Sequence, residues 1–88
     1  MHNYSRLCLT EFVKTTNTHA AGAVKHPTVS TVDDCKRTCI KKDGCAGFDF
    51  IINECWLHNS VSIKKVFPGN GVDLYRGTVS CKIKLGVY

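Results

Sequence analysis

Several features of known protein classes are missing from this sequence of 88 residues. No apolar run approaches the roughly 20 residues that a membrane helix needs, and the longest apolar cluster, residues 48–52, is interrupted by Asp49. No C-x-x-C pair and no pair of His at zinc-finger spacing occurs, which disfavours a metal site. The sequence therefore predicts one small domain that does not insert into a membrane and binds no metal.

Motifs of catalysis are missing as well. No Ser lies in a G-x-S-x-G context, and no Gly-rich loop has the spacing that cradles phosphate. Asp33 and Asp34 are the one adjacent carboxylate pair, but the start of a helix explains them. We therefore predict that the protein is not an enzyme and has no cofactor.

Cysteine is abundant, with six residues in 88. An even number in so short a chain is typical of a disulfide framework, which supplements a limited core and places the protein outside the cytosol. Residues 1–6 are polar and lack the apolar core of a secretory signal, so we expect a processed chain or a module excised from a larger secreted or surface protein. Six cysteines allow 15 pairings, and spacing alone does not choose among them. The six are Cys8, Cys35, Cys39, Cys45, Cys55 and Cys81.

Hydrophobic periodicity predicts one helix among about five strands, hence an α+β fold. Ser30 or Thr31 can cap the helix at its start, and Asp43-Gly44 ends it. Asn53-Glu54 reads as a tight turn between two strands. Residues 16–27 are expected to form a loop. The expected strands cover residues 7–15, 47–52, 55–58, 60–67 and 72–79.

The region from Asp34 to Phe50, continued by residues 53–57, resembles the PAN/apple domain family. The shared features are C-x₃-C on a helix, a third Cys shortly before Gly47-Phe48, and a fourth Cys followed by a hydrophobic pair. The resemblance implies an antiparallel sheet of about five strands that cradles the helix. It covers residues 7–81, leaving residues 1–6 as a flexible N-terminus and residues 82–88 as a tail or a final strand extension.

The resemblance also implies the pairing of the cysteines. The family arrangement corresponds to Cys35–Cys55, Cys39–Cys45 and an outer bridge Cys8–Cys81. Some members of the family lack the outer pair, so this bridge is expected to matter more for stability than for topology.

Basic charge is the most informative functional feature, because the formal net charge is +5. An extracellular basic surface favours acidic proteins or sulfated glycans as partners, and the same compartment disfavours nucleic acid. The alternative is that each cluster is simply a solvated face. Some family members, such as the N-terminal domain of hepatocyte growth factor, bind heparin through the helix side, which ranks the helix cluster first. The ligand-binding candidates are Lys36, Arg37, Lys41 and Lys42 on the helix, and Lys64, Lys65 and Arg76 elsewhere.

Aromatic side chains offer a second possible binding surface. Phe48, Phe50, Trp56, Leu57 and Tyr75 could line a groove, but most of them are expected to fill the core, with Trp56 packed on a disulfide and Tyr75 or Phe67 exposed. The four His residues are expected at solvated positions. Asn3 lies in a glycosylation sequon.

The leading hypothesis from these observations is a non-catalytic, extracellular adhesion or recognition module that binds a protein or a carbohydrate. One alternative is a lectin-like domain that binds glycosaminoglycans or other glycans through the basic clusters. Another is a secreted inhibitor or anti-haemostatic effector that acts alone.

Overall fold

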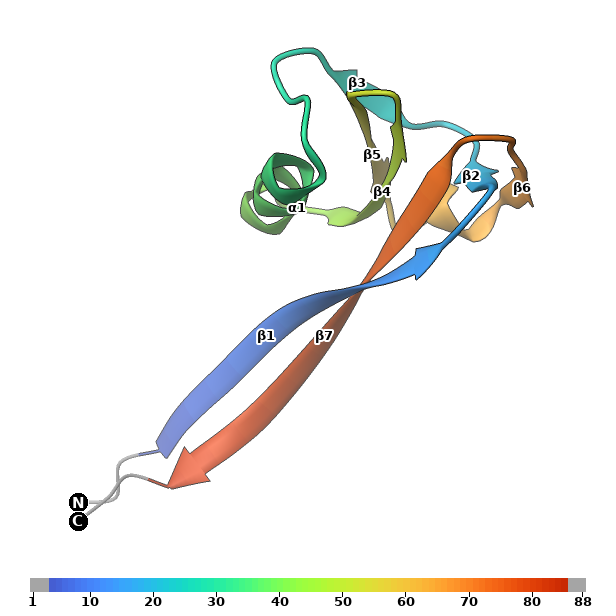
Figure 1. Ribbon diagram of the computed structural model, residues 1–88. Helices are drawn as coiled ribbons and strands as arrows, with labels where there is room; N and C mark the ends of the chain where they lie inside the picture. The colour runs from blue at the N-terminus through green and yellow to red at the C-terminus, as the bar shows by residue number, and fades with distance from the viewer. Residues whose placement is uncertain (1–3, 86–88) are drawn as a thin grey trace.

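A five-stranded antiparallel sheet forms the body of the protein. The computed structural model describes the backbone of residues 4–85 and the side chains of residues 10–79. The sheet has the order β1-β7-β4-β5-β3 (Figure 1). Its strands are β1 (Tyr4–Thr15), β7 (Asp73–Leu85), β4 (Cys45–Ile51), β5 (Glu54–Asn59) and β3 (Val24–His26). The predicted α+β fold, with one helix on an antiparallel sheet, is confirmed.

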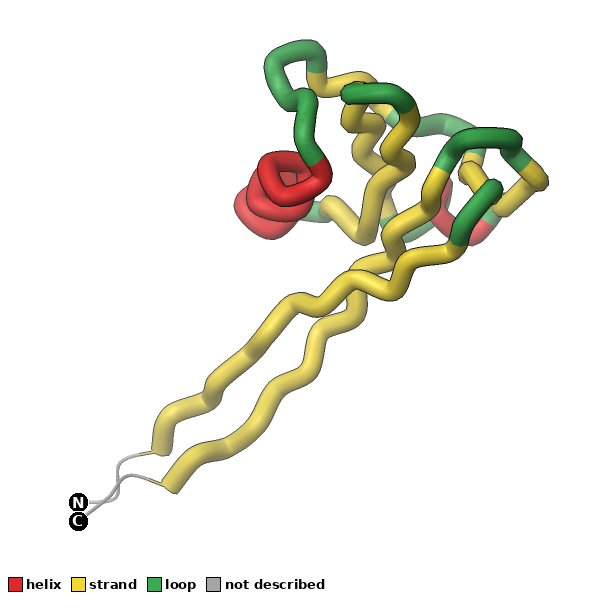
Figure 2. The backbone as a smooth tube through the Cα atoms, in the orientation of Figure 1, coloured by secondary structure: helices red, strands yellow, loops and turns green. Residues whose placement is uncertain are grey.

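The helix α1 (Val32–Lys41) lies on one face of this sheet (Figure 2). Thr31 is the N-cap, and its hydroxyl accepts a hydrogen bond from the Asp34 backbone N–H at 3.2 Å. Gly44 adopts φ +81° just after the helix, a conformation that glycine reaches without steric cost. The helix thus begins and ends where the capping residues predict.

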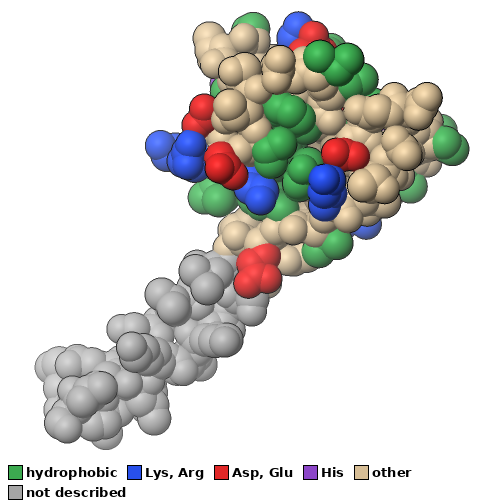
Figure 3. Space-filling view, in the orientation of Figure 1, with side chains coloured by type: hydrophobic (Ala, Val, Ile, Leu, Met, Phe, Trp, Pro, Cys, Tyr) green, Lys and Arg blue, Asp and Glu red, His purple; other side chains and the backbone are tan. Residues whose placement is uncertain are grey.

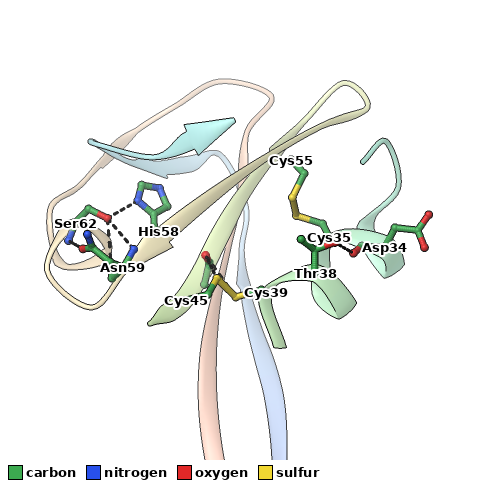
Figure 4. Close-up of a disulfide and its surroundings, with 10 residues drawn as sticks. Asp34, Cys35, Thr38, Cys39, Cys45, Cys55, His58, Asn59 and Ser62 are labelled. Atoms are coloured by element: carbon green, nitrogen blue, oxygen red, sulfur yellow. Dashed lines mark hydrogen bonds between the residues drawn. A yellow bond between two sulfur atoms is a disulfide. The ribbon is translucent and has the colours of Figure 1, made fainter. Parts of the chain in front are cut away.

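Two disulfides fasten the helix to the sheet (Figure 4). Cys35 is bonded to Cys55 on β5, and Cys39 is bonded to Cys45 at the start of β4. These are the two inner pairings that the family resemblance implies. The outer pair falls on residues whose side chains lie outside the described part, but the register places Cys8 and Cys81 opposite each other in β1 and β7.

The main core lies between the helix and the sheet. Phe48, Leu57 and Tyr75 are buried there together with the helix cysteines, and Phe50 packs against them half-buried. The Phe48 ring stacks on Tyr75 with centroids 4.7 Å apart, and Phe12 meets Phe48 edge-on at 5.3 Å. Tyr75 is therefore a core residue, and of the two aromatic residues named as candidates for exposure it is Phe67, 48% exposed, that lies at the surface.

A second, smaller layer covers the other face of the sheet. It consists of a two-stranded sheet, β2 (Thr18–Ala20) with β6 (Val66–Pro68), and the 3₁₀ helix η1 (Ser62–Lys64). Ala20, Ile63 and Leu74 form its core. Gly47 permits this contact, because a Cβ at that position would lie 2.3 Å from the Ile63 side chain.

The structure corrects three details of the sequence prediction. Residues 16–27 contain β2 and β3 instead of a loop, since short strands of three residues leave no periodic signal. The strand expected at residues 60–67 is a 3₁₀ turn followed by β6. The hairpin turn is Ile52-Asn53, one residue earlier than expected, and both residues have positive φ.

The strands β1 and β7 continue beyond the body as a two-stranded ribbon (Figure 1). They pair in register from Tyr4–Leu85 to Thr15–Leu74, whereas β4 pairs with β7 only from Asp73 to Arg76. The strands therefore reach into residues 4–6 and 82–85. The glycosylation candidate Asn3 lies outside the described residues.

Candidate functional site

The four basic residues predicted on the helix all lie on α1 or directly after it, and we call them the helix-side cluster. Arg37 is already engaged, because its guanidinium donates a hydrogen bond to the Asp34 carboxylate. This bond, with a smaller contribution from Thr31, holds the pKa of Asp34 below its ordinary value. The same bond raises the pKa of Arg37. The Asp34 carboxylate therefore offsets the positive charge of Arg37 within the helix-side cluster.

Lys36 points toward the edge of the core instead of freely into solvent. Its ammonium group lies 5.7 Å from the centre of the Tyr75 ring, and that of Lys14 on β1 lies 6.0 Å from the same ring. Lys14 also forms an ion pair with Asp73 at 3.6 Å. Lys14 is a basic neighbour that sequence reasoning missed, because only the pairing of β1 with β7 brings it beside Tyr75.

Lys41 and Lys42 are exposed where the helix ends. Their charges suit the negative end of the helix dipole, and neither forms a salt bridge with a described residue. The exposed Asp43 follows directly. Figure 3 shows Lys and Arg side chains interspersed with Asp and Glu on the face it presents.

Lys64, Lys65 and Arg76 form a separate group, which we call the opposite-face cluster. Arg76 alternates with the core residue Tyr75 on β7, so it belongs to the face away from the helix, and it donates a hydrogen bond to the Ile63 carbonyl at 3.4 Å. This contact brings the first part of β7 beside η1, where Lys64 begins the exposed basic pair. Within residues 10–79, none of the seven acidic side chains of the sequence forms a salt bridge with this cluster.

A buried polar network lies beneath the β2–β6 layer. His58 is 1% exposed, and its Nε2 lies 2.8 Å from the Asp49 carboxylate while its Nδ1 lies 2.8 Å from the Ser62 hydroxyl (Figure 4 shows the His58–Ser62 contact). The prediction that every His is solvated is therefore wrong for His58. An ionised carboxylate only accepts, so Nε2 donates to Asp49, and in the neutral ring Nδ1 accepts from Ser62.

This network contains the Ser, His and Asp of a catalytic triad, but the Ser and Asp side chains are also bonded to the backbone and the His is buried. The Ser62 hydroxyl is also bonded by the Asn59 backbone N–H, and Asp49 accepts from the Ala20 backbone N–H at 3.1 Å. The imidazole is enclosed, and Ser62 lines none of the three main surface cavities. What the arrangement does is hold β2, β4, β5 and η1 together.

Three cavities stand out at the surface of residues 10–79. The largest, about 520 Å³, lies on the face away from the helix and is bordered by Asp49, Trp56 and Asn70. A second, about 320 Å³, lies between β3 and the end of the helix and is bordered by His26 and Lys42. A third, about 360 Å³, adjoins Phe12 and Ile40. Each therefore offers a possible place for a ligand group.

Trp56 lies on the helix-free face, not on a disulfide as predicted. Its partner in the register is Asp49, and the neighbours Cys55 and Leu57 point to the core. Alternation along β4 and β5 was a usable signal for this placement: Asp49 alternates with Phe48 and Phe50, and Trp56 and His58 alternate with Leu57.

Within the described residues, no group of three or more His, Cys, Asp or Glu side chains is placed to hold a metal ion. Among the same residues, no helix has the length and apolarity to cross a membrane. The Nδ1 atoms of His19 and His26 are buried without a hydrogen-bond partner in this part of the chain.

Comparison with known proteins gives one match. The family model described as PAN domain matches residues 8–81. No curated protein and no solved structure matches the chain significantly. The matched segment includes the helix, both inner disulfides and both basic clusters.

Proposed function

Because this chain belongs to the PAN domain family, whose members are generally non-catalytic modules that bind proteins or carbohydrates, we propose that it is an extracellular recognition module for an acidic ligand. The family and its disulfides are typical of extracellular proteins. The ligand classes that suit a basic surface there are sulfated glycans and acidic proteins. The chain acts as a binding surface and carries out no chemistry.

The observation that carries this proposal is the absence of bonded acidic side chains around Lys64, Lys65 and Arg76 among the described residues. Arg76 is oriented by the Ile63 carbonyl, so its guanidinium loses little freedom when a ligand binds. The helix-side cluster, by contrast, holds its Arg37 against Asp34. We therefore assign the main contact to the opposite-face cluster and a lesser one to the helix side.

Heparin, used as a sulfated probe, tests this assignment. The chain offers two adjacent lysine pairs of equal charge, so Lys64→Gln/Lys65→Gln and Lys41→Gln/Lys42→Gln form matched variants. We expect both proteins to fold, because all four lysines are exposed. We expect retention on immobilised heparin at physiological salt. In the Lys64/Lys65 variant, the slope of log affinity against log salt should fall by about one for each ionic contact with a sulfate group that is removed.

Comparing the two variants distinguishes an effect of the net charge of the protein from an effect of the position of the lysines. If net charge alone governed binding, they would elute at the same salt concentration. A weaker retention of the Lys41/Lys42 variant would move the site to the helix side, and elution of the unaltered chain well below physiological salt would contradict the sulfated-glycan proposal. An acidic protein partner would then be the ligand to seek.

A further inference from the structure

The cavity of about 520 Å³ has the make-up of a binding site that is separate from the basic clusters. It is a hollow of about 520 Å³ between the helix-free face of the main sheet and the chain segments around β2 and residues 69–72. Small side chains create it, since Ala20, Ala21, Ala23 and Gly69 leave the space that larger residues would fill. We call it the Trp56 pocket.

Trp56 gives the pocket a flat aromatic surface that is held in place. Its indole Nε1–H donates to the Glu54 carboxylate at 3.1 Å, and the Lys25 ammonium group lies 5.9 Å from the centre of the ring. Lys25 in turn bonds Glu54 at 3.2 Å, which closes a triangle of contacts outside the pocket. The ring is half-buried, so part of it remains open to the pocket. The Trp56 side chain therefore loses little conformational freedom when a ligand binds.

Polar groups border the platform. The Asp49 carboxylate is fixed by His58 and by the Ala20 backbone N–H, and both contacts are shortest at its Oδ2. Its Oδ1 lies 3.3 Å from the Ala20 nitrogen and has no other hydrogen-bond partner among the described residues. Oδ1 thus retains capacity to accept from a ligand hydroxyl. Asn70 is exposed on the rim, and its amide group both donates and accepts.

The charge of the lining narrows the ligand class. Lys and Arg are missing from the pocket wall and a carboxylate is present, so an anionic ligand group is disfavoured. The Asp49 carboxylate is 5% exposed and already accepts hydrogen bonds from His58 and from the Ala20 backbone N–H, so it has room for one more donor and is a poor partner for a cationic group. An apolar platform beside one accepting carboxylate oxygen and the Asn70 amide suits a neutral polyol, whose C–H face stacks on the ring while its hydroxyls bond the rim.

We propose that the Trp56 pocket binds a neutral pyranose unit of a glycan. This goes beyond the proposed recognition of acidic ligands and does not depend on it, because the two sites use different side chains and different forces. Binding here is governed by stacking and hydrogen bonds, so it is insensitive to salt.

The chain contains a single Trp, so its fluorescence reports directly on the pocket. We propose titration with glucose, galactose, mannose and N-acetylglucosamine, one at a time, up to about 50 mM, where a millimolar dissociation constant would approach saturation. The expected result is a saturable shift in Trp56 emission with at least one sugar, unchanged between low and physiological salt.

Two variants locate the binding. Ala21→Leu is expected to fill the hollow from an exposed position, leave the fold intact and weaken binding about tenfold. Lys64→Gln/Lys65→Gln should bind the sugar as the unaltered protein does, which distinguishes this site from the basic cluster. Backbone amide chemical shifts of Ala21 and Asn70 give a readout that does not rely on the indole.

The proposal is overturned if none of the four sugars gives a saturable change, or if Ala21→Leu folds and binds as tightly as the unaltered protein. Loss of sugar binding in the Lys64/Lys65 variant would also overturn it, because the two sites would then be one. Heparin retention can succeed or fail independently of all three results.

Discussion

Ile52 shows at the scale of one residue how a turn can impose an unfavourable conformation. It lies in the two-residue turn between β4 and β5 with φ +34°, next to Asn53 with φ +58°. Positive φ brings the Cβ of an L-residue close to the backbone, and branching at Cβ increases the crowding. The side chain is 82% exposed, so little packing compensates for this conformation.

Replacing Ile52 by Asn should therefore stabilise the protein. Asn tolerates the left-handed region, so we expect a gain of about 1 kcal/mol and a rise in Tm of about 4–8 °C in thermal unfolding followed by circular dichroism. Val79→Asn is the matched control, since Val79 is 69% exposed and lies in β7. A Tm that rises equally in both variants, or in neither, would show that the turn is not strained.

Glu54 makes the Trp56 platform depend on pH. Hydrogen bonds from the Trp56 indole and from Lys25 hold the pKa of Glu54 below its ordinary value. A carboxyl with a lowered pKa in the folded state contributes stability above the usual value near 4.3, and this contribution is lost as pH falls through the lowered pKa. Trp56 should therefore stay anchored at neutral pH and loosen only in acid.

The chemical shift of the Trp56 indole N–H measures this directly. We expect a transition with its midpoint below about 4.3, and we expect Glu54→Gln to abolish it while the chain remains folded. A midpoint above that value would contradict the assigned contact. So would an unchanged transition in the Gln variant.

At the scale of elements, the outer part of the β1–β7 ribbon is the weakest piece of the fold. Beyond Arg76, β7 pairs with β1 alone, and an isolated pair of strands is marginally stable in water. Cys8 and Cys81 are direct partners in the register. We therefore propose that a disulfide between them, as the family resemblance implies, fastens this ribbon.

Replacing Cys8 and Cys81 together by Ser tests the proposed bridge. Hydrogen exchange of the amides near both residues should become much faster, while the amides of β4 and β5 keep their protection because the inner disulfides remain. The loss of stability should not exceed about 4 kcal/mol, the chain-entropy value for a loop of this length. Unchanged exchange in the ribbon, or free thiols at these positions in the unaltered protein, would exclude the bridge.

Local sequence signals within each element explain which elements could be predicted. The helix was predictable because its cap residues, its acidic first turn and its cysteine stripe all agree. The short strands β2, β3 and β6 could not be predicted in this way, since three residues are too few to show a hydrophobic period. Their pairing also depends on partners distant in sequence. The contact of Arg76 with Ile63 depends in the same way on two elements that meet only in the fold.

At the scale of the whole molecule, the chain is more extended than a compact domain. Its radius of gyration is 15.3 Å, against about 12 Å expected for a compact chain of this length, because the ribbon projects from the body. The body itself has two faces with different character. One bears the disulfide-bonded helix, and the other bears the β2–β6 layer, the Trp56 pocket and the opposite-face cluster.

The sequence by itself determined the fold class, the helix and its limits, and the family resemblance, because these follow from local periodicity, capping chemistry and cysteine spacing. Only the tertiary structure decided that the basic residues form two separate surfaces and that Asp49 and His58 are buried together. These depend on strand order and on which face of the sheet each side chain occupies. A linear sequence does not record which strands become neighbours, so the candidate sites emerge only once the chain is folded.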